Sequence, residues 1–135
     1  MSWDGYLDNC SAQSQDHIVR CCIISLDGGS VWNTTTHAKA LKITPAEGAK
    51  IAKAFKDKNF SSFMSTGIYV EGQKFQFLRE VEGKVMLGKK KGLGFVSFQS
   101  SKQAIICAFG SEDKQQGNAN KGLSVVGDYL ESVGY

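Results

Sequence analysis

The sequence has no hydrophobic run of the roughly 18 residues that a membrane span needs. Its N-terminus carries Asp4 and no basic-then-apolar-then-small pattern, so a secretory signal is not expected. The net charge of +3 is too small to indicate a nucleic-acid partner by itself. With 135 residues and 41% hydrophobic content, the chain is expected to form one domain, residues 1–135, around a substantial core.

Metal-binding and catalytic patterns are also scarce. The cysteines are Cys10, Cys21, Cys22 and Cys107. None is spaced as C-x-x-C, and the neighbours Cys21 and Cys22 would point to opposite faces of a strand, so we interpret them as small apolar residues in a reducing cytosol. His17 and His37 have no partner ligands at metal-binding spacing. We therefore expect no metal, no cofactor and no enzyme activity, although a base for a cysteine nucleophile could be found only in three dimensions.

The segment 88–94, Gly-Lys-Lys-Lys-Gly-Leu-Gly, has the look of a phosphate-binding loop. It lacks the Gly-Lys-Ser/Thr ending and the strand-to-helix setting of such loops. Two interpretations stay open: a solvated hairpin turn protected by its charge, or a contact with an anionic surface.

Apolar spacing predicts a helix at each end of the chain. Ser2 is a suitable N-cap for the first, whose face is Trp3, Tyr6, Leu7 and Cys10. The last helix follows a polar loop over 111–120, and its face is Leu123, Val126, Leu130 and Val133. A third helix is predicted from Thr44 to about residue 56, because Thr44, Pro45 and Glu47 form a capping box with proline at the first helical position.

Strand patterns fill the remainder. Residues 17–25 are apolar and β-branched, a turn follows at 27–29, and 31–35 is predicted to be the return strand of a hairpin. Five further strands are predicted over 68–70, 75–81, 84–87, 94–99 and 103–109. Short turns between them, including 88–92, indicate an antiparallel meander. The expected fold is therefore a single α+β domain with both terminal helices on one face of the sheet.

The aromatic residues are the most informative feature. Trp3 and Tyr6 lie at one end of the chain and Tyr129 and Tyr135 at the other, whereas Trp32 follows the first turn. Chain ends are poorly ordered unless something holds them, so large aromatics there indicate docked elements. They could be core packing, or a platform whose ring faces and polar tips bind a stiff proline-rich helix through its free carbonyls.

In order and spacing, the sequence resembles the profilin family along its whole length. The motifs are Ser2-Trp3-Asp4-Gly5-Tyr6, Trp32 after Asp27-Gly28-Gly29, Ile43-Thr44-Pro45-Ala46-Glu47, Gly72-Gln73-Lys74-Phe75, Leu78-Arg79, Gly88-Lys89-Lys90-Lys91-Gly92, Gln103-Ala104-Ile105-Ile106 and Gly127-Asp128-Tyr129-Leu130. Vertebrate profilins often have histidine where Tyr129 stands. The lysine-rich segment and the short 111–120 loop look more like plant, protist or invertebrate forms.

The resemblance implies a monomeric cytoplasmic protein, associated with the cytoskeleton, that binds monomeric actin, proline-rich proteins and acidic phosphoinositides. It implies smaller helices on the sheet face opposite the terminal helices. The implied proline-rich site is Trp3, Tyr6, Trp32, Tyr129, Leu130 and Tyr135. The implied actin site is Met64, Arg79, Lys89, Lys90, Asn120, Lys121 and Val125. The implied phosphoinositide site is Lys89, Lys90 and Lys91.

Three functions are therefore open. The first is a non-enzymatic adaptor that holds actin and a proline-rich assembly factor on opposite faces. The second is a module for proline-rich ligands with little or no actin binding. The third is a small enzyme or phosphoinositide sensor, which no residue cluster in the sequence favours.

Overall fold

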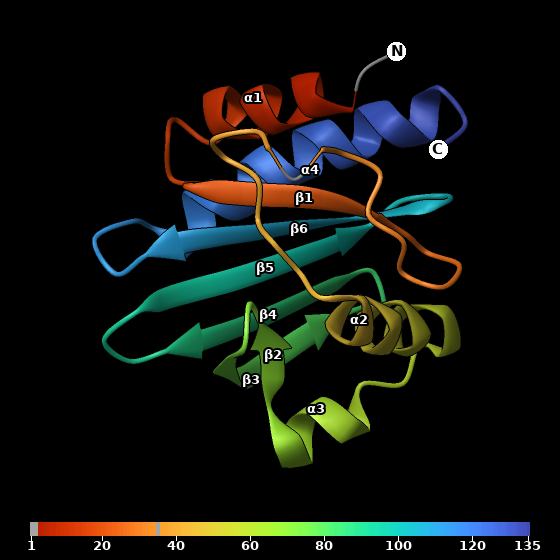
Figure 1. Cartoon of the computed structure of the whole chain (residues 1–135), viewed down its shortest axis with the longest axis vertical. Helices are drawn as coiled ribbons and strands as arrows, with labels where there is room; N and C mark the ends of the chain where they lie inside the picture. The colour runs from red at the N-terminus through yellow and green to blue at the C-terminus, as the bar shows by residue number, and fades with distance from the viewer. Residues whose placement is uncertain (1–2, 35) are drawn as a thin grey trace.

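A computed structural model of the chain describes residues 3–34 and 36–135. The predicted cap Ser2, and Thr35 at the end of the predicted return strand, lie outside these residues. Figure 1 labels the elements in chain order. They are α1 (Asp4–Gln13), β1 (Arg20–Ser25), α2 (Pro45–Asp57), α3 (Ser61–Thr66), β2 (Ile68–Val70), β3 (Gln73–Val81), β4 (Val85–Lys90), β5 (Gly94–Ser100), β6 (Ala104–Ser111) and α4 (Gln116–Ser132).

The strands form one curled antiparallel sheet in the order β1-β6-β5-β4-β3-β2. The predicted meander is confirmed, because β2 to β5 each pair with the next strand along the chain. The first strand closes the order at the far edge by pairing with β6, where Cys22 lies opposite Cys107.

The predicted N-terminal hairpin forms only next to its turn, and residues 31–34 do not form the predicted return strand. Within residues 31–34, one isolated bridge, Ile24 to Val31, joins β1 to the segment that was expected to return beside it. The Asn33 side chain accepts a hydrogen bond from the Ile23 amide at 2.9 Å, so it occupies a position that a ladder carbonyl would take. The segment therefore leaves the sheet after the Trp32 amide donates to the Ile23 carbonyl at 2.8 Å.

Two apolar cores lie on the two faces of the sheet, and Figure 1 shows the helices divided between them. On one face, α1 and α4 cover a core that includes Leu7, Cys21 and Leu123. On the other, α2 and α3 cover a core that includes Cys22, Phe63 and Met86. The expected placement of terminal and smaller helices is confirmed, and adjacent cysteines point to opposite faces as strand alternation requires.

Several predicted element ends shift in the structure. The capping box at the start of α2 is confirmed, with Thr44 and Glu47 bonding to each other's backbone amides. The final helix begins at Gln116, so the predicted loop over 111–120 is too long by one helical turn. Val133, predicted to face the core, lies just past this helix and is 44% exposed.

The lysine-rich turn is also shorter than predicted. Strand β4 continues to Lys90, where it pairs with Gly94 of β5. Lys89 and Lys90 are therefore strand residues, and only Lys91 belongs to the turn. Strand residues alternate between faces, so the run cannot act as one outward-facing group of charges.

Candidate functional site

Five aromatic side chains converge where the two ends of the chain meet β1, and we call them the aromatic cluster. Its members are Trp3, Tyr6, Trp32, Tyr129 and Tyr135. The Trp3 ring lies at the centre, 4.8 Å from the ring of Trp32 and 5.1 Å from that of Tyr135, which meets it edge-on. Tyr6 lies 5.3 Å from Trp3 and 6.2 Å from Tyr129, and continues the row. The structure thus assembles residues that are more than a hundred positions apart in the sequence.

The members of the cluster differ in exposure. Tyr129 is 52% exposed, whereas Tyr6 is 6% exposed, and Trp3, Trp32 and Tyr135 are half-buried. Burial raises the pKa of the Tyr6 phenol, and the nearby phenols of Tyr129 and Tyr135 raise it further. The Tyr6 hydroxyl therefore stays protonated at neutral pH as a hydrogen-bond donor. Leu130 is fully buried, so it supports the cluster from below and presents no surface of its own.

Helix α1 fixes the segment that carries Trp32. The Asp4 carboxylate accepts hydrogen bonds from the Thr34 amide at 2.8 Å and the Thr34 hydroxyl at 2.6 Å. These bonds lower the pKa of Asp4, the side-chain bond most. Trp3 is directly next to Asp4 in the sequence, and Trp32 is two residues before Thr34. The contact between Asp4 and Thr34 therefore holds the two indoles beside each other.

The C-terminus is fixed as firmly. Tyr135 lies beyond the end of α4, and its amide donates to the Leu130 carbonyl at 2.8 Å. Its carbonyl accepts from the Ser101 hydroxyl at 2.8 Å and from the Gln103 amide. The Gln103 side chain also donates to the Gly134 carbonyl at 2.9 Å. The turn between β5 and β6 thereby holds the last ring of the cluster in place.

Close packing of α1 on α4 sets the remaining geometry. A Cβ atom at Gly122 would lie 2.7 Å from the Ser14 Cβ, so only glycine allows this approach. A groove of about 190 Å³ runs between the helices and continues the cluster, lined by Tyr6, Asn9, Gln13, Val125, Val126 and Tyr129. Val125, predicted to contact actin, therefore lies on the aromatic side of α4.

The other predicted actin residues are spread over several surfaces. Arg79 lies opposite Leu87, and Lys89 follows Leu87 by two, so these side chains share the sheet face that α4 covers. Gln116 at the start of α4 donates to the Ser97 hydroxyl at 3.2 Å, which places that end of the helix over β5. One surface is therefore bordered by Arg79 and Lys89 of the strands and by Asn120 and Lys121 of α4.

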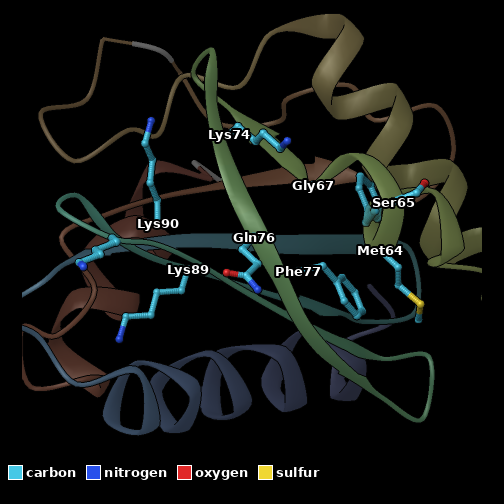
Figure 2. Close-up of a pocket in the computed structure, with 10 residues that line it drawn as sticks. Met64, Ser65, Gly67, Lys74, Gln76, Phe77, Lys89 and Lys90 are labelled. Atoms are coloured by element: carbon cyan, nitrogen blue, oxygen red, sulfur yellow. The ribbon is translucent and has the colours of Figure 1, made fainter.

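Asn120 has a buried side-chain oxygen for which no hydrogen-bond partner is found among the described residues. Met64 lies apart from the α4 surface, on α3, and is 64% exposed. It lines a hollow of about 450 Å³ with Phe77, Lys74 and the lysines at the end of β4 (Figure 2).

The lysine run diverges, as Figure 2 shows for Lys89 and Lys90. Lys89 points to the α4 side of the sheet. Lys90 points to the opposite side, where its ammonium donates to the Gln73 side-chain oxygen at 2.6 Å. Lys91 is exposed on the turn. Among the residues that the structure describes, none of the three forms an ion pair with a carboxylate.

The described part of the chain offers no group of three or more His, Cys, Asp or Glu side chains that could hold a metal ion. Hydrogen bonding to Cys10 and burial raise the pKa of the Cys21 thiol, and contact with Cys107 and burial do the same for Cys22. These two thiols are therefore poor nucleophiles at neutral pH. Within residues 3–34 and 36–135, no helix has the length and hydrophobicity of a membrane span.

Together, the fold and the cluster define a small α+β protein with an aromatic surface built from both ends of its chain. A family profile described as "Profilin" matches residues 1–135. Profilin from Suberites domuncula is 56% identical over 99% of each chain, and profilin from Clypeaster japonicus is 55% identical over 99% of each. The chain belongs to the profilin family.

Solved structures agree with this assignment. Profilin from Schizosaccharomyces pombe, at 30% identity, superposes with a TM-score of 0.83 over 99% of this chain and 100% of that one. Mouse profilin IIa, solved in complex with a double repeat from the FH1 domain of mDia1, shares the fold at 22% identity, with a TM-score of 0.74 and full coverage of both chains. Profilins are non-enzymatic cytoplasmic proteins that bind actin and regulate its polymerisation.

Proposed function

We propose that this protein binds monomeric actin on the surface bordered by β3, β4 and α4, and proline-rich ligands on the aromatic cluster. It would act without catalysis, as a monomer in the cytoplasm, by holding an actin subunit close to a proline-rich assembly factor. The observation that carries the proposal is the aromatic cluster, because its five rings are brought together by hydrogen bonds from four separate segments.

The chemistry of the cluster suits a proline-rich ligand. Such a segment is a stiff left-handed helix with about three residues per turn and carbonyls free of internal hydrogen bonds. Its rings can pack on the exposed faces of Trp3, Trp32 and Tyr129, while indole N–H and phenol O–H groups donate to its carbonyls. Because ligand and cluster are both ordered before they meet, little conformational entropy is lost.

The proposed actin site is centred on Arg79, Lys89, Asn120 and Lys121. Its cationic side chains suit an acidic surface on the partner. Met64, Lys90 and Val125 are proposed contacts as well, but they lie on neighbouring surfaces. The two sites would use different parts of α4, since Asn120 and Lys121 lie in its first half and Tyr129 near its end. One molecule could then hold both partners at once.

Tryptophan fluorescence tests the proposal directly. Titration with a proline decamer should change the emission of Trp3 and Trp32, and monomeric actin added afterwards should bind without releasing the peptide. Lys121→Glu should weaken actin binding and leave the peptide titration unchanged, with Lys53→Glu on the exposed face of α2 as the charge-matched control. Peptide binding without actin co-sedimentation would select the proline-rich module that does not bind actin.

We also propose that Lys89, Lys90 and Lys91 contribute to binding acidic phosphoinositides. Each unpaired lysine near an anionic membrane adds about 1 kcal/mol, and lysine contacts phosphate as a point charge. Flotation with vesicles containing phosphatidylinositol bisphosphate should show binding that falls as salt rises and falls in the triple Lys→Ala variant. Undiminished binding by that variant would exclude the run as the lipid site.

A further inference from the structure

A second hollow, of about 460 Å³, lies at the open end of the curled sheet, on the face that α2 and α3 cover elsewhere. Here β1, β3 and β5 begin, and β2, β4 and β6 end. It is distinct from the aromatic cluster, because Tyr135 is bonded to the turn between β5 and β6, at the other end of those strands. A hollow of this size fits a small molecule and is too small for a folded partner.

The floor of the hollow is apolar. Phe75 and Phe109 meet edge to face with their ring centres 6.3 Å apart, and Val70 and Leu93 complete the lining. The Arg20 guanidinium lies 5.0 Å above the centre of the Phe109 ring and covers that face. A flat ring cannot stack on that covered face of Phe109, so an aliphatic chain suits the floor better.

The rim of the hollow is cationic. Arg20 is neutralised by Glu71, whose oxygen lies 2.6 Å from its guanidinium nitrogen. Glu71 is itself fixed, because its carboxylate accepts from the Lys42 amide at 2.8 Å. Lys90 donates only to the neutral Gln73 side chain, and Lys91 has no carboxylate partner among the described residues. One carboxylate lies at the same turn, because Glu112 accepts from the Gly92 amide at 2.7 Å. With Arg20 neutralised, the two lysines and Glu112 leave the rim with a net positive charge beside an apolar floor.

We propose that this hollow binds an amphipathic anion: an alkyl chain seated against Leu93 and Phe109, with its anionic head at the ammonium groups of Lys90 and Lys91. The two lysines also belong to the proposed phosphoinositide site. The present inference does not rest on that site, because it needs neither a phosphate group nor a membrane. It gives Lys90 a role on the face of the sheet to which its side chain points.

Alkanoates of increasing length are the test, followed by amide chemical shifts in NMR titrations. Affinity should rise about fourfold per methylene from hexanoate to octanoate, the factor for moving one methylene out of water. The shifts should centre on Phe75, Leu93 and Phe109. Affinity that does not depend on chain length, or shifts centred on the aromatic cluster, would overturn the proposal.

The charge requirement is tested separately. Lys91→Gln removes one head-group contact without touching the floor, and should weaken octanoate binding by about fivefold while binding of uncharged 1-octanol stays the same. The matched control, Lys53→Gln on the exposed face of α2, should change neither. Equal weakening by both variants, or equal affinity for octanoate and octanol in the unmodified protein, would contradict the anionic head.

Discussion

The aromatic cluster and the lysine run (Lys89, Lys90 and Lys91) differ in how distance along the sequence relates to position on the surface. The cluster gathers Trp3, Trp32 and Tyr135 from three distant segments into rings about 5 to 6 Å apart. The lysine run consists of immediate neighbours, and the pleat of β4 sends Lys89 and Lys90 to different faces. Neighbouring residues in a strand therefore need not belong to the same site, whereas residues from the two ends of the chain can form one site when both ends pack on the same sheet.

The two regions also differ in how firmly they are held. Each segment of the cluster is tied by hydrogen bonds to another element, as with Asp4 to Thr34 and Ser101 to Tyr135. In the run, Lys90 has one side-chain bond, and none of the three lysines has an ion pair among the described residues. We expect the cluster to act as a preformed site and the run to act through charge.

The largest expected effect is the loss of proline-peptide binding in Trp3→Ala. Trp3 contacts three other rings of the cluster, and loss of such a central aromatic costs about 2 kcal/mol or more of binding free energy. Isothermal titration with a proline decamer measures it. The control is Tyr69→Ala, an exposed aromatic on β2, which should bind normally.

If Trp3→Ala unfolds, Tyr129→Ala provides the second measurement, because the Tyr129 side chain is half-exposed and adds little to the core. A folded Trp3→Ala protein that binds the peptide normally would contradict the proposed site.

Gly122→Ala should have the next largest effect, on the stability that holds the cluster together. The new methyl would press on Ser14 of the α1 C-terminus, and overpacking of this kind costs about 1–3 kcal/mol. Gly117→Ala is the matched control on the same helix, because its Cβ would meet no atom within 4 Å. It should leave stability unchanged or raise it by up to about 1 kcal/mol. Urea unfolding compares them, and equal stabilities would refute close α1–α4 packing.

A smaller effect should separate neighbours in the lysine run. Lys89→Glu places a like charge opposite an acidic partner on the α4 side of the sheet, and should weaken actin binding by about 1 kcal/mol or more. Lys90→Glu, on the other face, should weaken it less. Pyrene-labelled actin monomers give both affinities. If the two variants weaken binding equally, strand alternation does not control the actin contact.

The smallest expected effect is a pH dependence from the Asp4 contact. Its pKa is lowered by the Thr34 bonds, so the contact stabilises the folded protein fully above the ordinary aspartate pKa of about 3.9. That contribution is lost as the pH falls through the lowered pKa. The unfolding temperature of Asp4→Ala should therefore differ from that of the unmodified protein at pH 6 and converge with it in acid. A constant difference across this range would exclude the carboxylate as the cause.

Much of this architecture could be predicted from the sequence. The capping box at Thr44 and Glu47, the apolar face of α1 and the five-strand meander depend on local patterns, and all are present. The predicted return strand after β1 is missing beyond its first bridge because the Asn33 side chain replaces a backbone partner, which no strand propensity encodes. The hydrogen bonds that hold the cluster, from Thr34 to Asp4 and from Gln103 to Gly134, join residues that are far apart in the sequence. Local sequence patterns therefore could not predict them.

The most direct test of two independent sites is one titration on one sample. The proline decamer is titrated into the protein alone and into the protein saturated with monomeric actin, with tryptophan emission corrected for actin. Because the aromatic cluster and the centre of the proposed actin site lie on different parts of the molecule, the account predicts the same dissociation constant for the peptide in both titrations. Displacement of the peptide by actin, or an unsaturable and featureless emission change in the protein alone, would contradict it.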